Sequence, residues 1–135
     1  MNSFVLKIAT PDGSVFDGKA ESLLVRTVLG DVEILAGHAD FLAALGIGRA
    51  RITANGQKRL AACSGGFVSV KGGEVSLCCT TFEFAEDIDV NRARAAKERA
   101  EADLSSNENN SHAEDRLKTK LARALSRISV WELNK

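Results

Sequence analysis

The stretch EDIDVNRARAAKERAEADL, residues 86–104, marks the point at which the chain changes character. It contains no glycine, proline or aromatic residue. Before it, the chain holds all 11 glycines (the last is Gly73), its one proline (Pro11) and all six phenylalanines (the last is Phe84). Glycine and proline punctuate strands and turns, whereas alanine with lysine, arginine and glutamate favours helix. We therefore expect a strand-rich domain over residues 1–85 and a helical domain over residues 86–135.

The sequence of the helical domain predicts an antiparallel two-helix hairpin. Asp87 or Asp89 can cap the first helix, which we expect to end near Ser105. The polar residues SSNENN, 105–110, predict a loop, and Ser111 with Glu114 has the spacing of a capping box that opens the second helix. The expected apolar stripes are Val90, Ala93, the stem of Lys97, Ala100 and Leu104 on the first helix, and Leu117, Leu121, Ala124 or Leu125, Ile128 and Trp131 on the second.

The sequence of the strand-rich domain predicts an antiparallel β-sandwich. The segment FVLKI, residues 4–8, alternates apolar and other side chains, and the turn sequence TPDG follows it. Further turn signals, FDG, GHAD, ANG, SGG and KGG, recur about every 8 to 12 residues, the spacing of short antiparallel strands. Parallel strands need crossover connections, and no stretch before residue 87 offers room for a crossover helix.

Composition excludes several classes of protein. The 18 basic and 18 acidic residues balance, which argues against a nucleic-acid binder that works through a general basic field. No apolar run approaches the ~18 residues of a membrane span, and the N-terminus lacks the pattern of a signal peptide, so we expect no membrane insertion and a cytosolic protein. The three cysteines, Cys63, Cys78 and Cys79, show no metal-binding spacing, and we expect reduced packing residues and no metal site.

No catalytic motif is present. The sequence lacks G-x-S-x-G, a P-loop and G-x-G-x-x-G, and neither His38 nor His112 accompanies a nucleophile or a ligand set. We expect no catalytic residues and no independent enzyme.

Basic residues recur at helical spacing in both expected helices. Arg92 and Arg99 share one face of the first helix, and the second carries a stripe of Arg116, Lys120, Arg123 and Arg127. Two such stripes facing each other repel unless an anion lies between or beside them. The other interpretation is a solvated face on which Glu98, Glu101 and Asp115 are the partners. The spacing leaves both open.

Over essentially its whole length the chain resembles the epsilon subunit of bacterial F-type ATP synthases. The segments that carry the resemblance are IATPDGSVFDGKAESLLV (8–25), GDVEILAGHADFLAAL (30–45), SGGFVSV (64–70), IDVNRARAAKERAEADL (88–104) and RALSRISVWEL (123–133). The resemblance implies a non-catalytic subunit of the rotor stalk, peripheral on the cytoplasmic face of the bacterial membrane. It implies that the sandwich binds the gamma subunit and the c-subunit ring. The hairpin would either fold against the sandwich or extend into the alpha/beta head and block ATP hydrolysis.

The resemblance also implies an ATP site in the hairpin and a ring contact on the sandwich. The family motif [I/L]DxxRA is matched by Ile88, Asp89, Arg92 and Ala93, the phosphate-binding arginines by Arg99, Arg123 and Arg127, and the acidic contact to the adenine amino group by Glu83. Asp31 and His38 are the candidate positions for contact with the c ring. No cofactor is required, and ATP would be a regulatory ligand. The alternative is a free-standing ATP-sensing module with a different partner, and a small enzyme built on a β-sandwich is a weaker rival.

Overall fold

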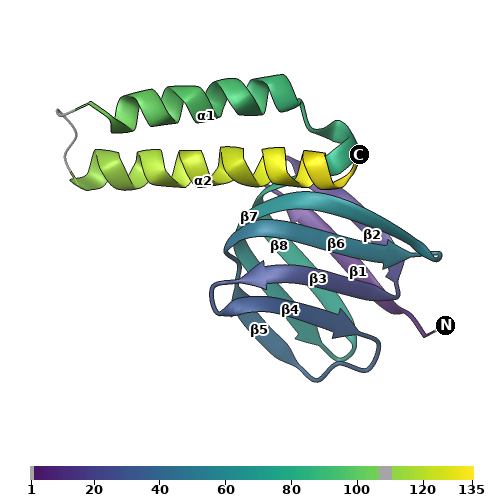
Figure 1. Cartoon of the computed structure of the whole chain (residues 1–135). Helices are drawn as coiled ribbons and strands as arrows, with labels where there is room; N and C mark the ends of the chain where they lie inside the picture. The colour runs from purple at the N-terminus through teal and green to yellow at the C-terminus, as the bar shows by residue number, and fades with distance from the viewer. Residues whose placement is uncertain (1, 107–110) are drawn as a thin grey trace.

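The computed structural model describes residues 2–106 and 111–135. Eight strands come first, then a short 3₁₀ turn, η1, and two helices (Figure 1). The elements are β1 (Phe4–Thr10), β2 (Gly13–Ala20), β3 (Ser22–Thr27), β4 (Gly30–Leu35), β5 (Phe41–Ala44), β6 (Ile47–Ala54), β7 (Gln57–Lys71), β8 (Glu74–Phe84), η1 (Ala85–Asp87), α1 (Val90–Leu104) and α2 (Ser111–Leu133). The prediction of a β-sandwich followed by a helical hairpin is confirmed.

The strands form a sheet in the order β2-β1-β8-β7-β6-β3-β4, with β5 paired to β7, and this sheet folds into two layers. In Figure 1 strands β3, β4 and β6 lie in front of β1, β2 and β8. Every pair is antiparallel except β1 with β8, where Leu6 to Ala9 run parallel to Val75 to Cys78. Among the described strands the expectation of antiparallel pairing is wrong for this one pair. A crossover helix is unnecessary because strands β2 to β7 themselves form the connection between the two parallel partners.

Two of the predicted turns are wrong. SGG, residues 64–66, lies inside β7, and FDG, residues 16–18, lies inside β2. Gly65 and Gly66 have φ values of +70° and +90°, and a Cβ on Gly66 would lie 1.8 Å from the carbonyl oxygen of Cys78. The glycines therefore bend β7 where it passes between the layers, while the strand stays paired with β8 on both sides of the bend.

The core of the sandwich consists of the inward-facing residues of the strands. Phe4, Leu6 and Ile8 are buried, as the alternation in FVLKI predicts. Cys63 and Cys79 are buried free thiols whose Sγ atoms lie 3.4 Å apart. The hydrogen bond between them and their burial raise the pKa of the Cys79 thiol. Cys63 and Cys79 are buried packing residues, as expected, whereas Cys78, the third cysteine of that expectation, is only half-buried.

The first helix begins where the sequence predicts. Asp89 is its N-cap, and its Oδ1 accepts a hydrogen bond from the backbone N–H of Arg92 at 3.1 Å. Asp87, the other candidate cap, belongs to η1 instead. Ala93 and Ala100 are the buried residues of α1. The small side chains of this stripe let α1 lie close along α2 (Figure 1).

The second helix begins at Ser111 and packs on both α1 and the sandwich. Of the two residues left open by the pattern, Ala124 is fully buried, and Leu125 is 44% exposed. Most of the predicted loop, residues 107–110, lies outside the described residues. The sequence pattern missed Val130, which is 1% exposed and joins Ala62, Ala85 and Ile88 in an apolar cluster with Leu60 and Trp131. We call this set the docking cluster, because it joins α2 to β7 and to the linker that follows β8. No helix among residues 2–106 and 111–135 has the length and apolar character needed to cross a membrane.

Candidate functional site

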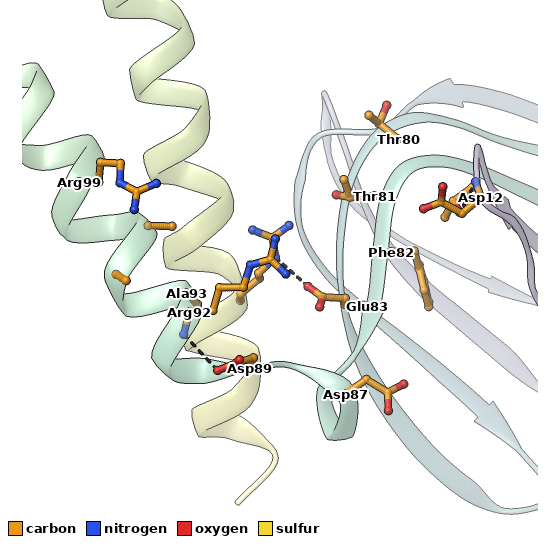
Figure 2. Close-up of a pocket in the computed structure, with 14 residues that line it drawn as sticks. Asp12, Thr80, Thr81, Phe82, Glu83, Asp87, Asp89, Arg92, Ala93 and Arg99 are labelled. Atoms are coloured by element: carbon orange, nitrogen blue, oxygen red, sulfur yellow. Dashed lines mark hydrogen bonds and ion pairs between the residues drawn. The ribbon is translucent and has the colours of Figure 1, made fainter.

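A cavity of about 640 Å³ lies between the hairpin and the sandwich (Figure 2). Its walls come from α1, from Arg127 of α2, from the last part of β8 and from the turn that joins β1 to β2. Pockets for small molecules and cofactors in proteins are typically about 300 to 1,000 Å³, so this cavity has the capacity for a ligand of nucleotide size.

The helical wall of the cavity is basic. Arg92 and Arg99 lie seven residues apart on α1, and both line the cavity together with Arg127. Within the part of the chain that the structure describes, no hydrogen bond or ion pair holds the guanidinium group of Arg92 or Arg99. The neighbouring α1 residues on this wall, Ala93 and Ala96, are small, which keeps the space in front of the guanidinium groups open. Unpaired guanidinium groups around an open cavity favour a phosphate or carboxylate ligand.

The opposite wall offers acids and hydroxyl groups. Thr81 and Glu83 alternate along β8, so their side chains leave the same face of the strand toward the hairpin. Thr80 and Asp12 lie further along this wall, as Figure 2 shows, with Asp12 in the turn between β1 and β2. The cavity is therefore polarised, with positive charge on the helices and hydrogen-bond acceptors on the sandwich.

One ion pair connects the two walls. Arg127 donates from Nε to Oε1 of Glu83 at 2.7 Å, which links α2 to β8. The two side chains are 30% and 39% exposed, so the bond is only partly shielded from water. Charge-assisted hydrogen bonds of this length are among the stronger ones in proteins.

Of the residues assigned to the ATP site, the structure brings most together. Glu83, Asp89, Arg92, Ala93, Arg99 and Arg127 all line the cavity. Asp89 lies at the end of α1, where its carboxylate serves as the helix cap.

Two assigned residues lie elsewhere. Ile88 is buried in the docking cluster, where its side chain is part of the hairpin's attachment. Arg123 donates from Nε to Oγ of Ser64 at 2.8 Å, and Ser64 is itself buried in the sandwich. The helical stripe on α2 is therefore split, with Arg127 in the cavity and Arg123 bonded to β7.

The sequence interpretation missed the sandwich side of the cavity. Thr10, Asp12, Thr80, Thr81, Phe82 and Asp87 line it and were not assigned. Thr81 could have been found, because it lies two residues before Glu83 on the same strand face. Thr10 and Asp12 could not, because the parallel pairing of β1 with β8 brings their turn to the cavity, and no pattern in the sequence indicates that pairing.

Asp31 and His38, the candidate ring contacts, do not line the cavity: Asp31 lies near the start of β4 and His38 lies between β4 and β5. Arg26 donates from Nε to Oδ1 of Asp31 at 2.7 Å, and this bond holds the pKa of the Asp31 carboxyl below its ordinary value. The His38 ring donates from Nδ1 to the carbonyl oxygen of Ala39 at 2.7 Å and meets Phe41 edge-on with ring centroids 5.7 Å apart. Large apolar side chains are exposed nearby, with Leu29 at 95% and Leu42 at 72%.

Comparison with known proteins covers both parts of the chain. Residues 3–85 match the family model "ATP synthase, Delta/Epsilon chain, beta-sandwich domain", and residues 86–132 match "ATP synthase, Delta/Epsilon chain, long alpha-helix domain".

Similar proteins include the ATP synthase epsilon chain of Staphylococcus saprophyticus, 42% identical over 134 residues that cover 98% of this chain and 99% of the relative. The ATP synthase epsilon chain of Bacillus pumilus is 39% identical over 96% of this chain and 98% of its own length. Among solved structures, a chain of the Euglena gracilis mitochondrial ATP synthase shares the fold with a TM-score of 0.80 at 23% identity, over 92% of this chain and 78% of that chain. This chain belongs to the delta/epsilon chain family of ATP synthase.

Proposed function

We propose that the chain is the epsilon-type subunit of the central stalk of a bacterial F-type ATP synthase, and that it couples proton flow to ATP synthesis without catalysing a reaction itself. The family membership of both parts of the chain supports this proposal. In it the sandwich binds the gamma subunit and the c ring, at the cytoplasmic face of the membrane. Val28 and Leu29 are exposed in the turn between β3 and β4, and a backbone hydrogen bond from Val28 to Ala44 places this turn beside β5, where Leu42 is also exposed. Neighbouring exposed apolar side chains commonly mark an interface, which supports a protein contact there.

Purification of the tagged full chain from native membranes tests this part of the proposal. We expect the gamma subunit and the c ring to be recovered with it. Recovery of the chain as a monomer free of gamma would favour the free-standing ATP-sensing module instead.

The second part of the proposal is that the hairpin regulates ATP hydrolysis and that ATP controls the hairpin. The observation that carries it is the polarised cavity, in which Arg92, Arg99 and Arg127 face Glu83 and the hydroxyl groups of β8. Triphosphate oxygens match the guanidinium groups, and a base with an amino group matches the acceptors. In this proposal the extended hairpin enters the alpha/beta head and inhibits hydrolysis, and the docked hairpin does not.

Ligand binding would act on the hairpin by mass action. The cavity takes its walls from both helices and from β8, so it exists only while the hairpin is docked on the sandwich. A ligand that binds only the docked form stabilises that form by about 2.7 kcal/mol at 100 times its dissociation constant. ATP would therefore withdraw the inhibitory hairpin when ATP is plentiful.

Calorimetric titration of the full chain with ATP tests this second part. Loss of one hydrogen bond to a charged phosphate costs about 1.5–3 kcal/mol, so Arg92→Ala is expected to weaken binding roughly 10- to 100-fold. Arg116→Ala is the matched control, because it removes the same charge from the hairpin at a position that does not line the cavity. Equal affinities for the wild type and Arg92→Ala, or no binding at millimolar ATP, would contradict the proposal.

A further inference from the structure

Two thiols in contact lie directly beneath the surface on which the hairpin docks. Cys63 of β7 and Cys79 of β8 are both buried, and their Sγ atoms lie 3.4 Å apart. The two neighbours of Cys63 on β7 both attach the hairpin. Ala62 belongs to the docking cluster, and Ser64 accepts the hydrogen bond from Arg123. A change in the position of Cys63 therefore reaches two points at which α2 is held.

The geometry of the strands allows a bond between these sulfurs. Cys63 pairs with Phe82 just before the bend of β7, and Cys79 pairs with Gly66 in the bend itself. A disulfide needs its sulfurs about 2.05 Å apart, so the two atoms have to approach by about 1.4 Å from their present 3.4 Å. Rotation of the side chains and a small shift of β7 provide this approach, and the pairing of β7 with β8 is kept.

A small oxidant has a path to one of the two thiols. A second cavity, of about 10 Å³, lies where α2 meets β7, and Cys63 lines it together with Ser64 and Arg123. That volume is about the space that one water molecule needs. Cys79 is not among the residues that line this cavity. Local opening of α2 therefore exposes Cys63 first, and to small reagents before bulky ones.

Contact between the thiols distinguishes this pair from ordinary buried cysteines. A single buried thiol is usually inert, and burial with the hydrogen bond to Cys63 raises the pKa of the Cys79 thiol, which keeps it protonated. Once one sulfur is oxidised, however, the other lies beside it and completes the reaction without diffusion.

We propose that Cys63 and Cys79 form a redox-active pair, which a hydroperoxide oxidises to a disulfide, and that this disulfide weakens the docking of the hairpin. In the first step Cys63 loses its proton, its sulfur attacks one oxygen of the peroxide, and the O–O bond breaks. This step gives a sulfenic acid on Cys63 and one water. In the second step the Cys79 sulfur attacks the Cys63 sulfur, the S–O bond breaks, and the hydroxyl group leaves with the Cys79 proton as a second water.

The link to the hairpin follows from the position of Cys63 between Ala62 and Ser64. The docked hairpin fits the reduced pair, and approach of the sulfurs draws this part of β7 away from α2. Weakening of the hydrogen bond between Arg123 and Ser64 shifts the ratio of docked to undocked hairpin by up to about 10-fold. A disulfide that displaces its surroundings is also readily reduced, so the change is reversible. This inference goes beyond the proposed function and does not depend on ATP binding.

The test treats the full chain with dilute hydrogen peroxide in the absence of ATP. Trypsin cuts after Arg59, Lys71 and Arg92, so Cys63 and Cys79 lie on different peptides, and mass spectrometry after blocking of the free thiols identifies the bridge. Cys78→Ser removes the ambiguity between the two adjacent cysteines and is expected to form the same bridge. Hydrogen–deuterium exchange is expected to become about 3- to 10-fold faster in α2 and to stay unchanged in β3 and β6. Dithiothreitol is expected to restore the slow exchange.

Cys63→Ala is the matched control, because it keeps the other oxidisable residues and removes the pair. Peroxide is expected to leave its α2 exchange unchanged. Reversal by dithiothreitol in the wild type serves as the same control without a substitution in the core.

The inference is overturned if Cys63 and Cys79 both remain free thiols after peroxide treatment, or if the bridge joins other cysteines. A bridge between Cys63 and Cys79 that leaves α2 exchange unchanged overturns the coupling to the hairpin. Faster exchange that also occurs in Cys63→Ala, or that dithiothreitol does not reverse, overturns it as well. None of these results bears on the proposed ATP regulation, which its own titration tests.

Discussion

Val130→Ala is expected to release the hairpin from the sandwich while leaving the sandwich folded. Val130 is 1% exposed and contacts Ala62 on β7 and Ala85 and Ile88 in the linker, so its side chain contributes to docking and little to the core of either part. The substitution removes two methyl groups at about 0.8 kcal/mol each and leaves a small cavity, for a total of about 2 kcal/mol. That loss shifts the ratio of docked to undocked hairpin about 30-fold.

Hydrogen–deuterium exchange of the full chain measures this effect. Amides of α2 are expected to exchange faster in Val130→Ala, by up to about 30-fold, while amides of β3 and β6 keep their wild-type rates. Leu125→Ala is the matched control on the same helix, because Leu125 is 44% exposed and lies outside the docking cluster. Unchanged exchange in α2 would refute the assignment of the docking cluster. So would an equal acceleration in α2 and in the core strands, because that pattern indicates global unfolding.

Three further predictions follow from the same geometry. Deletion of residues 86–135 is expected to leave a folded sandwich that still binds gamma, because the large core cluster lies in the sandwich. Loss of gamma binding by the shortened chain would contradict this. Replacement of Ala93 and Ala100 by leucine is expected to separate α1 from α2 and to lower the ATPase activity of the assembled complex, and a rise in activity would contradict the docked arrangement. The Arg59 guanidinium holds the pKa of Glu86 below 4.5. This exposed pair therefore contributes about 0.2–1 kcal/mol to the free energy of unfolding. The contribution is fully present above about pH 4.5 and disappears as the pH falls through the lowered pKa. The difference in unfolding free energy between the wild type and Glu86→Gln is therefore expected at about pH 6 and not at about pH 3, and a difference that persists in acid would contradict it.

Local rules account for the parts of the fold that the sequence predicts well. The change of composition at residue 86 and the cap at Asp89 depend only on residues close together in the sequence, so the sequence predicts both. The same short-range pattern wrongly predicts a turn at SGG, because glycine with a positive φ occurs both in turns and in bends within a strand. Only the pairing with β8 distinguishes the two, and that pairing joins residues that lie far apart in the sequence.

The sequence likewise predicts one part of the candidate site and misses another. The arginines of α1 follow from helical spacing, and six of the eight residues implied by the resemblance line one cavity. The misplaced residues share a cause. Both were assigned from the resemblance to the family. Ile88 lies in the docking cluster and Arg123 bonds to Ser64, and a sequence motif carries no information about which of its residues attach the hairpin to the sandwich. Asp12 enters through the parallel strand pair, which no local pattern predicts.

In the proposed regulation ATP holds the hairpin in its docked position, and the single tryptophan of the chain reports on docking directly. Trp131 is partly buried against the docking cluster, so its fluorescence emission moves to shorter wavelength when the hairpin docks. The measurement is an ATP titration of Val130→Ala, in which the undocked population is raised, followed by the same titration of the double variant with Arg92→Ala. We expect a saturable shift to shorter wavelength in the first protein and none in the second over the same range of ATP. A spectrum that ATP leaves unchanged in Val130→Ala, or an equal shift in both proteins, would contradict it.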